Sequence, residues 1–183
     1  MKRFILTGMP GAGKTVILRR LEQDGFGVVE EAATDLIALE QAEGIAEPWT
    51  DPDFIDRVVG LQEQRQQRAA ALPEPIQFHD RSAICTAALA SYLGYPPSQK
   101  LQEEIERLKR NAIYRQSVFF IRSLGFVTPT EARRISLEEA KRFEAVHETI
   151  YKAHGFDLIF VEPGTIAERV AAIRCALHRM TSP

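Results

Sequence analysis

The sequence has only two cysteines, Cys85 and Cys175, among its 183 residues. Neither cysteine belongs to a CxxC pair, and no histidine is spaced from them as a zinc ligand would be. This excludes a disulfide framework and a cysteine-based zinc module. We therefore expect both cysteines to be buried thiols in a reducing compartment.

Long apolar runs and an excess of one charge are also missing. Only the run 4–6 follows the positively charged residues 1–3 before glycines begin, which is too short for a signal peptide, and nothing approaches a membrane span. The 23 basic and 25 acidic side chains leave a formal charge of −2, so no global field attracts nucleic acid or an anionic membrane. We expect a cytoplasmic protein with neither as a partner.

The numbers of glycine and proline residues are modest, at 11 and 10, while 45% of the side chains are apolar. This composition excludes disorder as the main state. A chain of this length buries roughly 70% of the surface it exposes when unfolded, which is enough for one core. We predict a single domain over residues 1–183.

Short apolar runs alternate with helical patterns along the chain. The pattern predicts five strands, at residues 4–6, 26–29, 76–78, 117–121 and 157–161. The last two runs are nearly continuous in apolar residues, as expected in a sheet covered on both faces. Strands of this kind need helical crossovers, so we predict an α/β fold with a parallel sheet, although the pattern alone does not give the strand order.

Several local signals mark the ends of the helices. Ser136 with Glu139, and Thr165 with Glu168, have the spacing of capping boxes. Asp51 is expected to cap a helix that has Pro52 at its first position. The stretch 122–135 is different in character, and we interpret it as a loop or lid.

The sequence from Gly8 to Thr15 carries the chemistry, because it fits G-x-x-x-x-G-K-[ST] between a predicted strand and a predicted helix. Glycine lets backbone amides turn towards a phosphate, and the start of a helix adds a partial positive charge. Lys14 is expected to reach the β and γ phosphates, and the Thr15 hydroxyl to coordinate Mg²⁺. The predicted nucleotide contacts in this loop are Gly8, Gly11, Ala12, Gly13, Lys14, Thr15 and Val16.

Asp80 and Arg81 follow the third predicted strand, at the edge of a parallel sheet where ligands gather. Asp80 is a candidate for holding Mg²⁺ or for accepting the proton of an attacking hydroxyl. Arg81 offers a planar fork for phosphate. The alternative is that Asp80 caps the next helix while Arg81 forms a surface ion pair.

Glu30 and Glu31 end the second predicted strand, and two adjacent side chains on extended backbone point to opposite faces. We choose Glu31 for binding a substrate hydroxyl or acting as general base, against the alternative that it serves only the electrostatics of a helix start. His79 is interpreted as a packed ring rather than a catalyst, and His147 and His154 receive no role because they have no evident partner.

Arg133 and Arg134 precede a well-capped helix and would suit a segment that closes over the nucleotide and places charge on the transferring phosphoryl group. The alternative is an ordinary helix surface, where two neighbouring arginines are also common. Trp49 and Phe54 are candidates for a substrate pocket or for core plugs. Gly164 follows the fifth strand and either meets the nucleotide base or forms a simple turn.

With these residues in place, the chain resembles the small P-loop kinases, specifically the AAA-domain or ribosylnicotinamide-kinase-like ATPase group. The likeness rests on residues 8–15, 29–33, 49–52 and 78–82 together with the lid arginines. It implies a three-layer sandwich in which helices flank a five-stranded parallel sheet of order 2-3-1-4-5.

The segment 80–82 is similar to the Asp/Glu-Arg-Ser/Tyr element of nucleoside and nucleotide kinases. The likeness implies that Asp80 serves metal or base, that Arg81 serves the substrate or a phosphate, and that Glu31 corresponds to the acid receiving a substrate hydroxyl. The favoured function is therefore a phosphotransferase that uses ATP and Mg²⁺ on a small acceptor, for which a nucleoside-like molecule is a candidate. Two alternatives stay open, which are an ATPase or nucleotide-dependent switch and a degenerate nucleotide-binding module. The sequence does not determine the oligomeric state.

Overall fold

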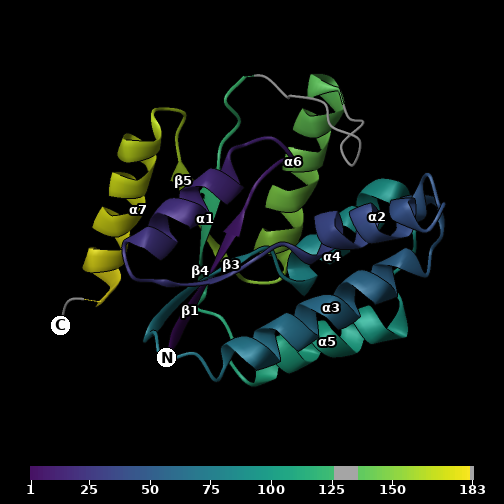
Figure 1. Ribbon diagram of the computed structural model, residues 1–183, viewed down its shortest axis with the longest axis horizontal. Coiled ribbons are helices and arrows are strands. Elements are labelled where there is room, and N and C mark those ends of the chain that lie inside the picture. Colours follow the sequence, from purple (N-terminus) through teal and green to yellow (C-terminus); the bar gives the residue numbers. More distant parts are fainter. Residues whose placement is uncertain (126–135, 182–183) are drawn as a thin grey trace.

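The computed structural model describes residues 1–125 and 136–181, and in them strands alternate with helices as predicted (Figure 1). The strands are β1 (Lys2–Thr7), β2 (Gly27–Val29), β3 (Ile76–Asp80), β4 (Ser117–Ile121) and β5 (Asp157–Val161). The helices are α1 (Lys14–Gln23), α2 (Ala32–Ala42), the 3₁₀ turn η1 (Pro48–Thr50), α3 (Phe54–Ala69), α4 (Ala83–Leu93), α5 (Gln99–Arg110), α6 (Leu137–Ala153) and α7 (Ile166–Thr181).

The five strands form one parallel sheet in the order β2-β3-β1-β4-β5, which confirms the predicted topology. The central strand β1 pairs with both β3 and β4, and Leu6 lies opposite Asp80 on one side and Phe119 on the other. The carboxyl ends of these three strands therefore meet at one edge of the sheet. The loops that follow them are the natural place for a ligand.

Helices cover both faces of the sheet, which gives three layers (Figure 1). Successive side chains of β1 alternate between two apolar clusters, because side chains on a strand point to opposite faces. Phe4 and Leu6 pack in the cluster that α1 and α7 complete, whereas Ile5 packs in the cluster that α3, α4 and α5 complete. The chain thus buries its apolar strands between two layers of helices.

The two predicted capping boxes are present. The Ser136 hydroxyl accepts a hydrogen bond from Glu139 N, and the Glu139 carboxylate accepts one from Ser136 N at 2.9 Å. Thr165 and Glu168 form the same reciprocal pair at the start of α7. These local contacts orient α6 and α7 as they leave their loops.

Three expectations from the sequence were wrong in detail. The helix α3 begins at Phe54 rather than at Pro52, and Asp51 accepts a bond from the backbone of Asp53. The strand β5 lies at the edge of the sheet, so it is only partly covered, and Phe160 is 37% exposed. Cys175 is exposed rather than buried, while Cys85 is a buried free thiol as expected.

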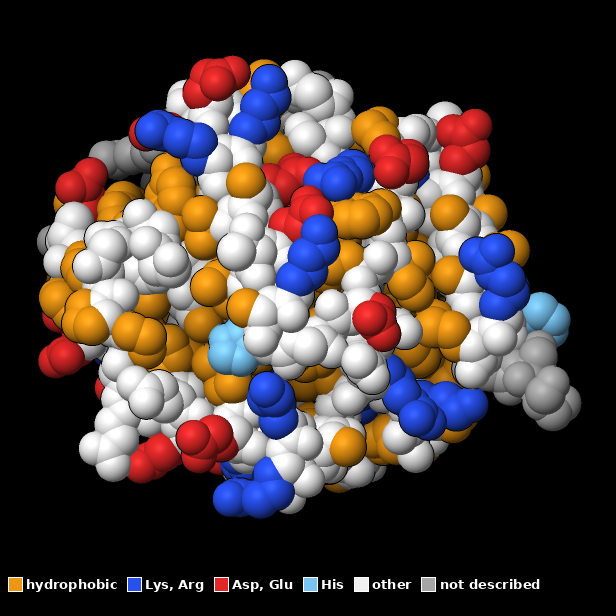
Figure 2. All heavy atoms as spheres, turned by 180° about the vertical axis from the view of Figure 1, so that it is seen from behind, with side chains coloured by type: hydrophobic (Ala, Val, Ile, Leu, Met, Phe, Trp, Pro, Cys, Tyr) orange, Lys and Arg blue, Asp and Glu red, His pale blue; other side chains and the backbone are white. Residues whose placement is uncertain are grey.

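The surface carries charges of both signs. Figure 2 shows one face of the molecule, on which acidic and basic side chains are interspersed with apolar ones and neither sign forms a continuous field. Among the helices that the structure describes, none has the length and apolar character needed to cross a membrane.

Candidate active site

The phosphate loop occupies residues 8–13, between the end of β1 and the start of α1. Gly8 has a φ of 131°, and a Cβ at this position would lie 2.3 Å from the backbone oxygen of Ile121 on β4. Any side chain there would collide with the neighbouring strand. The first helical bond of α1 runs from Ile17 N to Gly13 O, so the amides of Lys14 to Val16 precede the helical ladder and face an anion site.

The amide of Ala12, another residue predicted to contact the nucleotide, donates to Met9 O at 3.3 Å within the loop. Lys14 is buried, and its Nζ donates to the carbonyl oxygens of Gly8 and Met9 at 3.4 and 3.2 Å. Burial and the nearby Arg81 guanidinium lower the pKa of Lys14. The ammonium group is therefore held at the loop and has little water around it.

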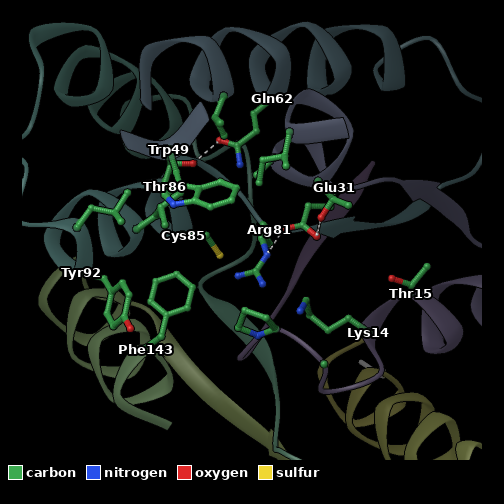
Figure 3. Close-up of a pocket in the computed structure, with 18 of the residues that line it drawn as sticks. Lys14, Thr15, Glu31, Trp49, Gln62, Arg81, Cys85, Thr86, Tyr92 and Phe143 are labelled. Atoms are coloured by element: carbon green, nitrogen blue, oxygen red, sulfur yellow. Dashed lines mark hydrogen bonds and ion pairs between the residues drawn. The ribbon is translucent and has the colours of Figure 1, made fainter. Parts of the chain in front are cut away.

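A cavity of about 510 Å³ opens beside this loop. One end is lined by loop and helix residues, among them Gly11, Gly13, Lys14, Thr15 and Val16. The other end is mostly apolar, with Ala33, Ile37, Trp49, Val58, Leu89, Tyr92, Leu93 and Phe143. Figure 3 shows Arg81 between the aromatic side chains and Lys14, with Glu31 beside it, so one space connects the loop with an aromatic compartment.

Glu31 and Arg81 form a partly buried ion pair inside this cavity, with 2.6 Å between Glu31 Oε1 and Arg81 Nε. Burial opposes ionisation of Glu31, but the cations Arg81 and Lys14 outweigh it and hold the pKa of Glu31 at about 2. Burial likewise disfavours the charged guanidinium, yet Glu31 leaves the pKa of Arg81 above its usual value. Both groups are charged at neutral pH.

His147 contacts the opposite edge of the Arg81 guanidinium, although no partner for this histidine was evident from the sequence. Its Nδ1 lies 2.9 Å from the carbonyl oxygen of Phe143 and must carry the proton, because a carbonyl only accepts. The Nε2 atom then accepts a hydrogen bond from Arg81 Nη1 at 3.0 Å. Burial and the Arg81 charge lower the pKa of His147 to about 3, which keeps the ring neutral.

Asp80 is buried at the carboxyl end of β3 and is not among the residues that line the cavity. Thr15 lies in the first turn of α1, and it lines the cavity. The described residues contain no group of three or more His, Cys, Asp or Glu arranged to hold a metal. One hydroxyl and one carboxylate are nevertheless a donor set that suits Mg²⁺, which usually binds one or two carboxylates together with substrate phosphates.

The remaining residues predicted from the sequence differ in whether they line the cavity. Glu30 does not line the cavity and pairs with Arg19 at the surface. Trp49 lines the cavity, whereas Phe54 is fully buried in the protein. Gly164 packs beside Glu168 outside the cavity lining. Arg133, Arg134 and most of the expected lid at 122–135 lie outside the described residues.

His79 is packed as expected. It is 2% exposed, and its ring meets Tyr114 edge to face with 5.0 Å between centroids. Burial lowers the pKa of His79 to about 3.

Several cavity residues have no sequence motif. Thr86, Leu89 and Tyr92 recur every three residues and share one face of α4, but the same spacing is typical of core packing. Gln62 on α3 accepts a hydrogen bond from Thr86 Oγ1 at 2.9 Å and links the two helices at the cavity wall. Helical periodicity was the only available signal for these residues.

A family model described as AAA domain matches residues 3–169. No curated protein matches the chain significantly. Among solved structures, NadR protein in complex with NR is 22% identical, with a TM-score of 0.72 over 98% of this chain and 50% of the NadR chain. Deoxyadenosine kinase from M. mycoides with products is 16% identical, with a TM-score of 0.64 over 97% of this chain and 99% of the kinase.

These structures share the fold of this chain, a small P-loop kinase-like α/β sandwich. The chain spans about half the length of the NadR protein that it matches.

Proposed function

Because this chain belongs to the AAA-domain family and has a P-loop kinase fold, we propose that it is a phosphotransferase that moves the γ-phosphoryl group of ATP to a small acceptor. One observation carries the proposal. A single cavity joins the phosphate loop to a partly buried carboxylate–arginine pair and an aromatic compartment. The arrangement provides two adjoining binding regions, one for a polyphosphate and one for an acceptor.

The nucleotide binds at the loop end of the cavity. Amides at the start of α1 and the Lys14 ammonium group hold the phosphates. Thr15 and Asp80 would hold Mg²⁺, which when bound neutralises charge on the phosphate oxygens. We further propose that Arg133 and Arg134 add positive charge at the transferring group, as the resemblance to P-loop kinases implies.

The acceptor binds at the other end. Trp49, Tyr92 and Phe143 contribute aromatic rings from three different elements, which favours a flat ring as part of the acceptor (Figure 3). Gln62 and Thr86 place polar atoms on the same wall. A nucleoside-like molecule combines a flat base with hydroxyl groups and fits both features. The name of one structural neighbour, a deoxyadenosine kinase, is in line with this choice.

In this proposal Glu31 orients the acceptor hydroxyl. Its carboxylate is ionised and accepts a hydrogen bond from that group, while Arg81 fixes the carboxylate and offers its own positive charge. The acceptor oxygen forms a bond to the γ-phosphorus as the bond to the ADP oxygen breaks, and the hydroxyl proton passes to Glu31. The low pKa of Glu31 is compatible with this role, because a loose phosphoryl-transfer transition state requires positioning more than basicity.

The test is to incubate the protein with Mg²⁺ and ATP and a panel of nucleosides, nucleotides and sugars. Phosphorylated acceptor is measured separately from free phosphate. Acceptor-dependent product formation, strongest with a nucleoside, is the expected result. Release of free phosphate that no acceptor changes would contradict the kinase proposal and favour an ATPase or a nucleotide-dependent switch.

A further inference from the structure

Arg169 is a buried cation that the proposed chemistry does not use. It lies in the first turn of α7 and is 1% exposed. Throughout residues 1–125 and 136–181 no carboxylate forms an ion pair with it, and its neighbour Glu168 is engaged in the capping box with Thr165. Burial lowers the pKa of Arg169, but a guanidinium stays charged in proteins. A buried charge without a counter-ion is costly and calls for a compensating role.

The guanidinium group is used to bind two loops. Arg169 Nη1 donates to the carbonyl oxygen of Ala12 at 2.8 Å, and Nη2 donates to the carbonyl oxygen of Arg122 at 2.9 Å. Ala12 belongs to the phosphate loop, and Arg122 directly follows β4. One side chain from the last helix thus fixes the loops at the carboxyl ends of two adjacent strands, in a geometry that only the arginine fork provides.

The contact with Ala12 determines the direction of the next amide. The structure contains no cis peptide among its described residues, and in a trans peptide the carbonyl oxygen and the following N–H point in opposite directions. With its carbonyl turned to Arg169, the Ala12–Gly13 peptide directs the Gly13 N–H away from α7. A charged donor on a carbonyl also polarises the N–H of the same peptide and strengthens it as a donor.

The lack of a side chain at Gly13 allows Arg169 to approach the loop closely. Its φ is 81°, and a Cβ there would lie 3.1 Å from Arg169 Nη1. A side chain at this position would therefore be strained and would also press on the guanidinium group. Gly13 lines the cavity and is the residue before Lys14. The second motif glycine leaves room for the arginine as well as for a phosphate.

We propose that Arg169 is a positioning residue for polyphosphate binding, which holds the Ala12–Gly13 peptide in the orientation that a phosphate requires and places a buried positive charge behind the loop. The proposal rests on the proposed function, because it assumes that the loop binds a polyphosphate. It adds a residue outside the motif, 157 positions from Ala12 along the chain.

The test compares Arg169→Met with Arg174→Met on the same helix. Arg174 is 58% exposed and pairs with Asp24 at the surface, so it controls for the loss of one positive charge from α7. Binding of ADP and of inorganic tripolyphosphate is measured by calorimetry, and thermal unfolding is measured in parallel. We expect Arg169→Met to weaken both ligands by about tenfold or more, and Arg174→Met to leave their affinities within about twofold.

A second variant keeps the proposal falsifiable if Arg169→Met does not fold. Arg169→Lys retains the charge but has one ammonium group, which cannot bond both carbonyls as the fork does. We expect an intermediate loss of ADP affinity, and a smaller fall in the unfolding temperature than Arg169→Met causes. Faster hydrogen exchange at the Gly13 amide should accompany this loss, because its peptide is held less firmly.

The outcomes separate the two proposals. If the wild-type protein binds neither ADP nor tripolyphosphate, the proposed function fails and this inference fails with it. If the wild type binds both ligands and folded Arg169→Met or Arg169→Lys binds them equally well, only the role of Arg169 is overturned. An affinity loss that matches the control Arg174→Met would overturn it as well.

Discussion

Arg81 is constrained both in its backbone conformation and in the contacts of its side chain. Its φ of 74° is in the left-handed region, which L side chains rarely adopt, and its amide donates to Leu6 O at the end of β1. Glu31 and His147 hold the guanidinium group from two sides. Backbone strain of this kind persists only where surrounding contacts determine it, and it clusters at functional sites.

Replacement of Lys14 by alanine tests the phosphate loop. Among the described residues, the ammonium group bonds only loop carbonyls, and it is desolvated, so its removal should leave the fold intact. It should lower kcat/KM by about a hundredfold to a thousandfold, because a preorganised donor to the phosphates is lost. Steady-state kinetics and thermal unfolding measure the two effects, with exposed Lys152→Ala as the matched control. Unchanged turnover would remove Lys14 from the mechanism.

The adjacent residues Glu30 and Glu31 provide a second pair of test and control substitutions. Glu31→Gln keeps an oxygen for Arg81 but removes the negative charge that orients the acceptor hydroxyl, so kcat should fall by about a hundredfold or more with little change in ATP affinity. Glu30→Gln lies outside the cavity and should keep wild-type kinetics. Equal effects of the two substitutions would show that Glu31 has no special role.

At the scale of elements, the helix α6 contributes three side chains to the cavity and to the residues around it. It contributes Phe143 to the cavity wall, His147 to Arg81, and Tyr151 to Cys85 through a 3.0 Å contact. The three residues are four apart and so share one face of the helix. Any shift of α6 along its axis moves a residue of the cavity wall and the contact that positions Arg81 together.

The Ser136 cap should therefore contribute to the stability of the fold through α6. Ser136→Ala removes the hydroxyl that accepts from Glu139 N, and the free energy of unfolding should fall by about 1 kcal/mol. Ser136→Asp keeps an acceptor at the same position and should restore most of the loss. Chemical denaturation measures the change. If Ser136→Ala is as stable as the wild type, the box does not anchor α6.

At the scale of the whole molecule, two buried neutral histidines couple folding to pH. The folded pKa values of His79 and His147 are about 3, against 6.5 for an ordinary histidine. Below pH 6.5 the unfolded chain binds these protons and the native state does not, so the stability present above that pH is lost as pH falls towards 3. Between pH 6.5 and 5 each ring should cost about 2 kcal/mol of unfolding free energy.

The prediction is tested by denaturation over that range for the wild type, His79→Gln and His147→Gln. Each substitution should remove one proton from the linkage and flatten the dependence on pH by about half. A dependence that neither substitution changes would mean that both rings are protonated in the native state.

Local signals in the sequence were sufficient to predict the phosphate loop, the capping boxes and several strands. Glycines with the GK-Thr ending predicted the phosphate loop, and serine or threonine three residues before glutamate predicted both capping boxes. The strands 117–121 and 157–161 were predicted at their observed bounds. These features depend on interactions within a few residues, which is why a short stretch of sequence encodes them.

The tertiary structure alone decided the contacts that complete the site. Arg81 meets His147 across 66 positions, and Arg169 reaches Ala12 across 157. No local pattern distinguishes such an arginine or histidine from one on a helix surface. Their roles arise because β1 lies between β3 and β4, and this places α4, α6 and α7 around the same edge of the sheet. The sequence by itself determined the phosphate loop and the alternating elements, and packing across the sheet determined which distant side chains surround them.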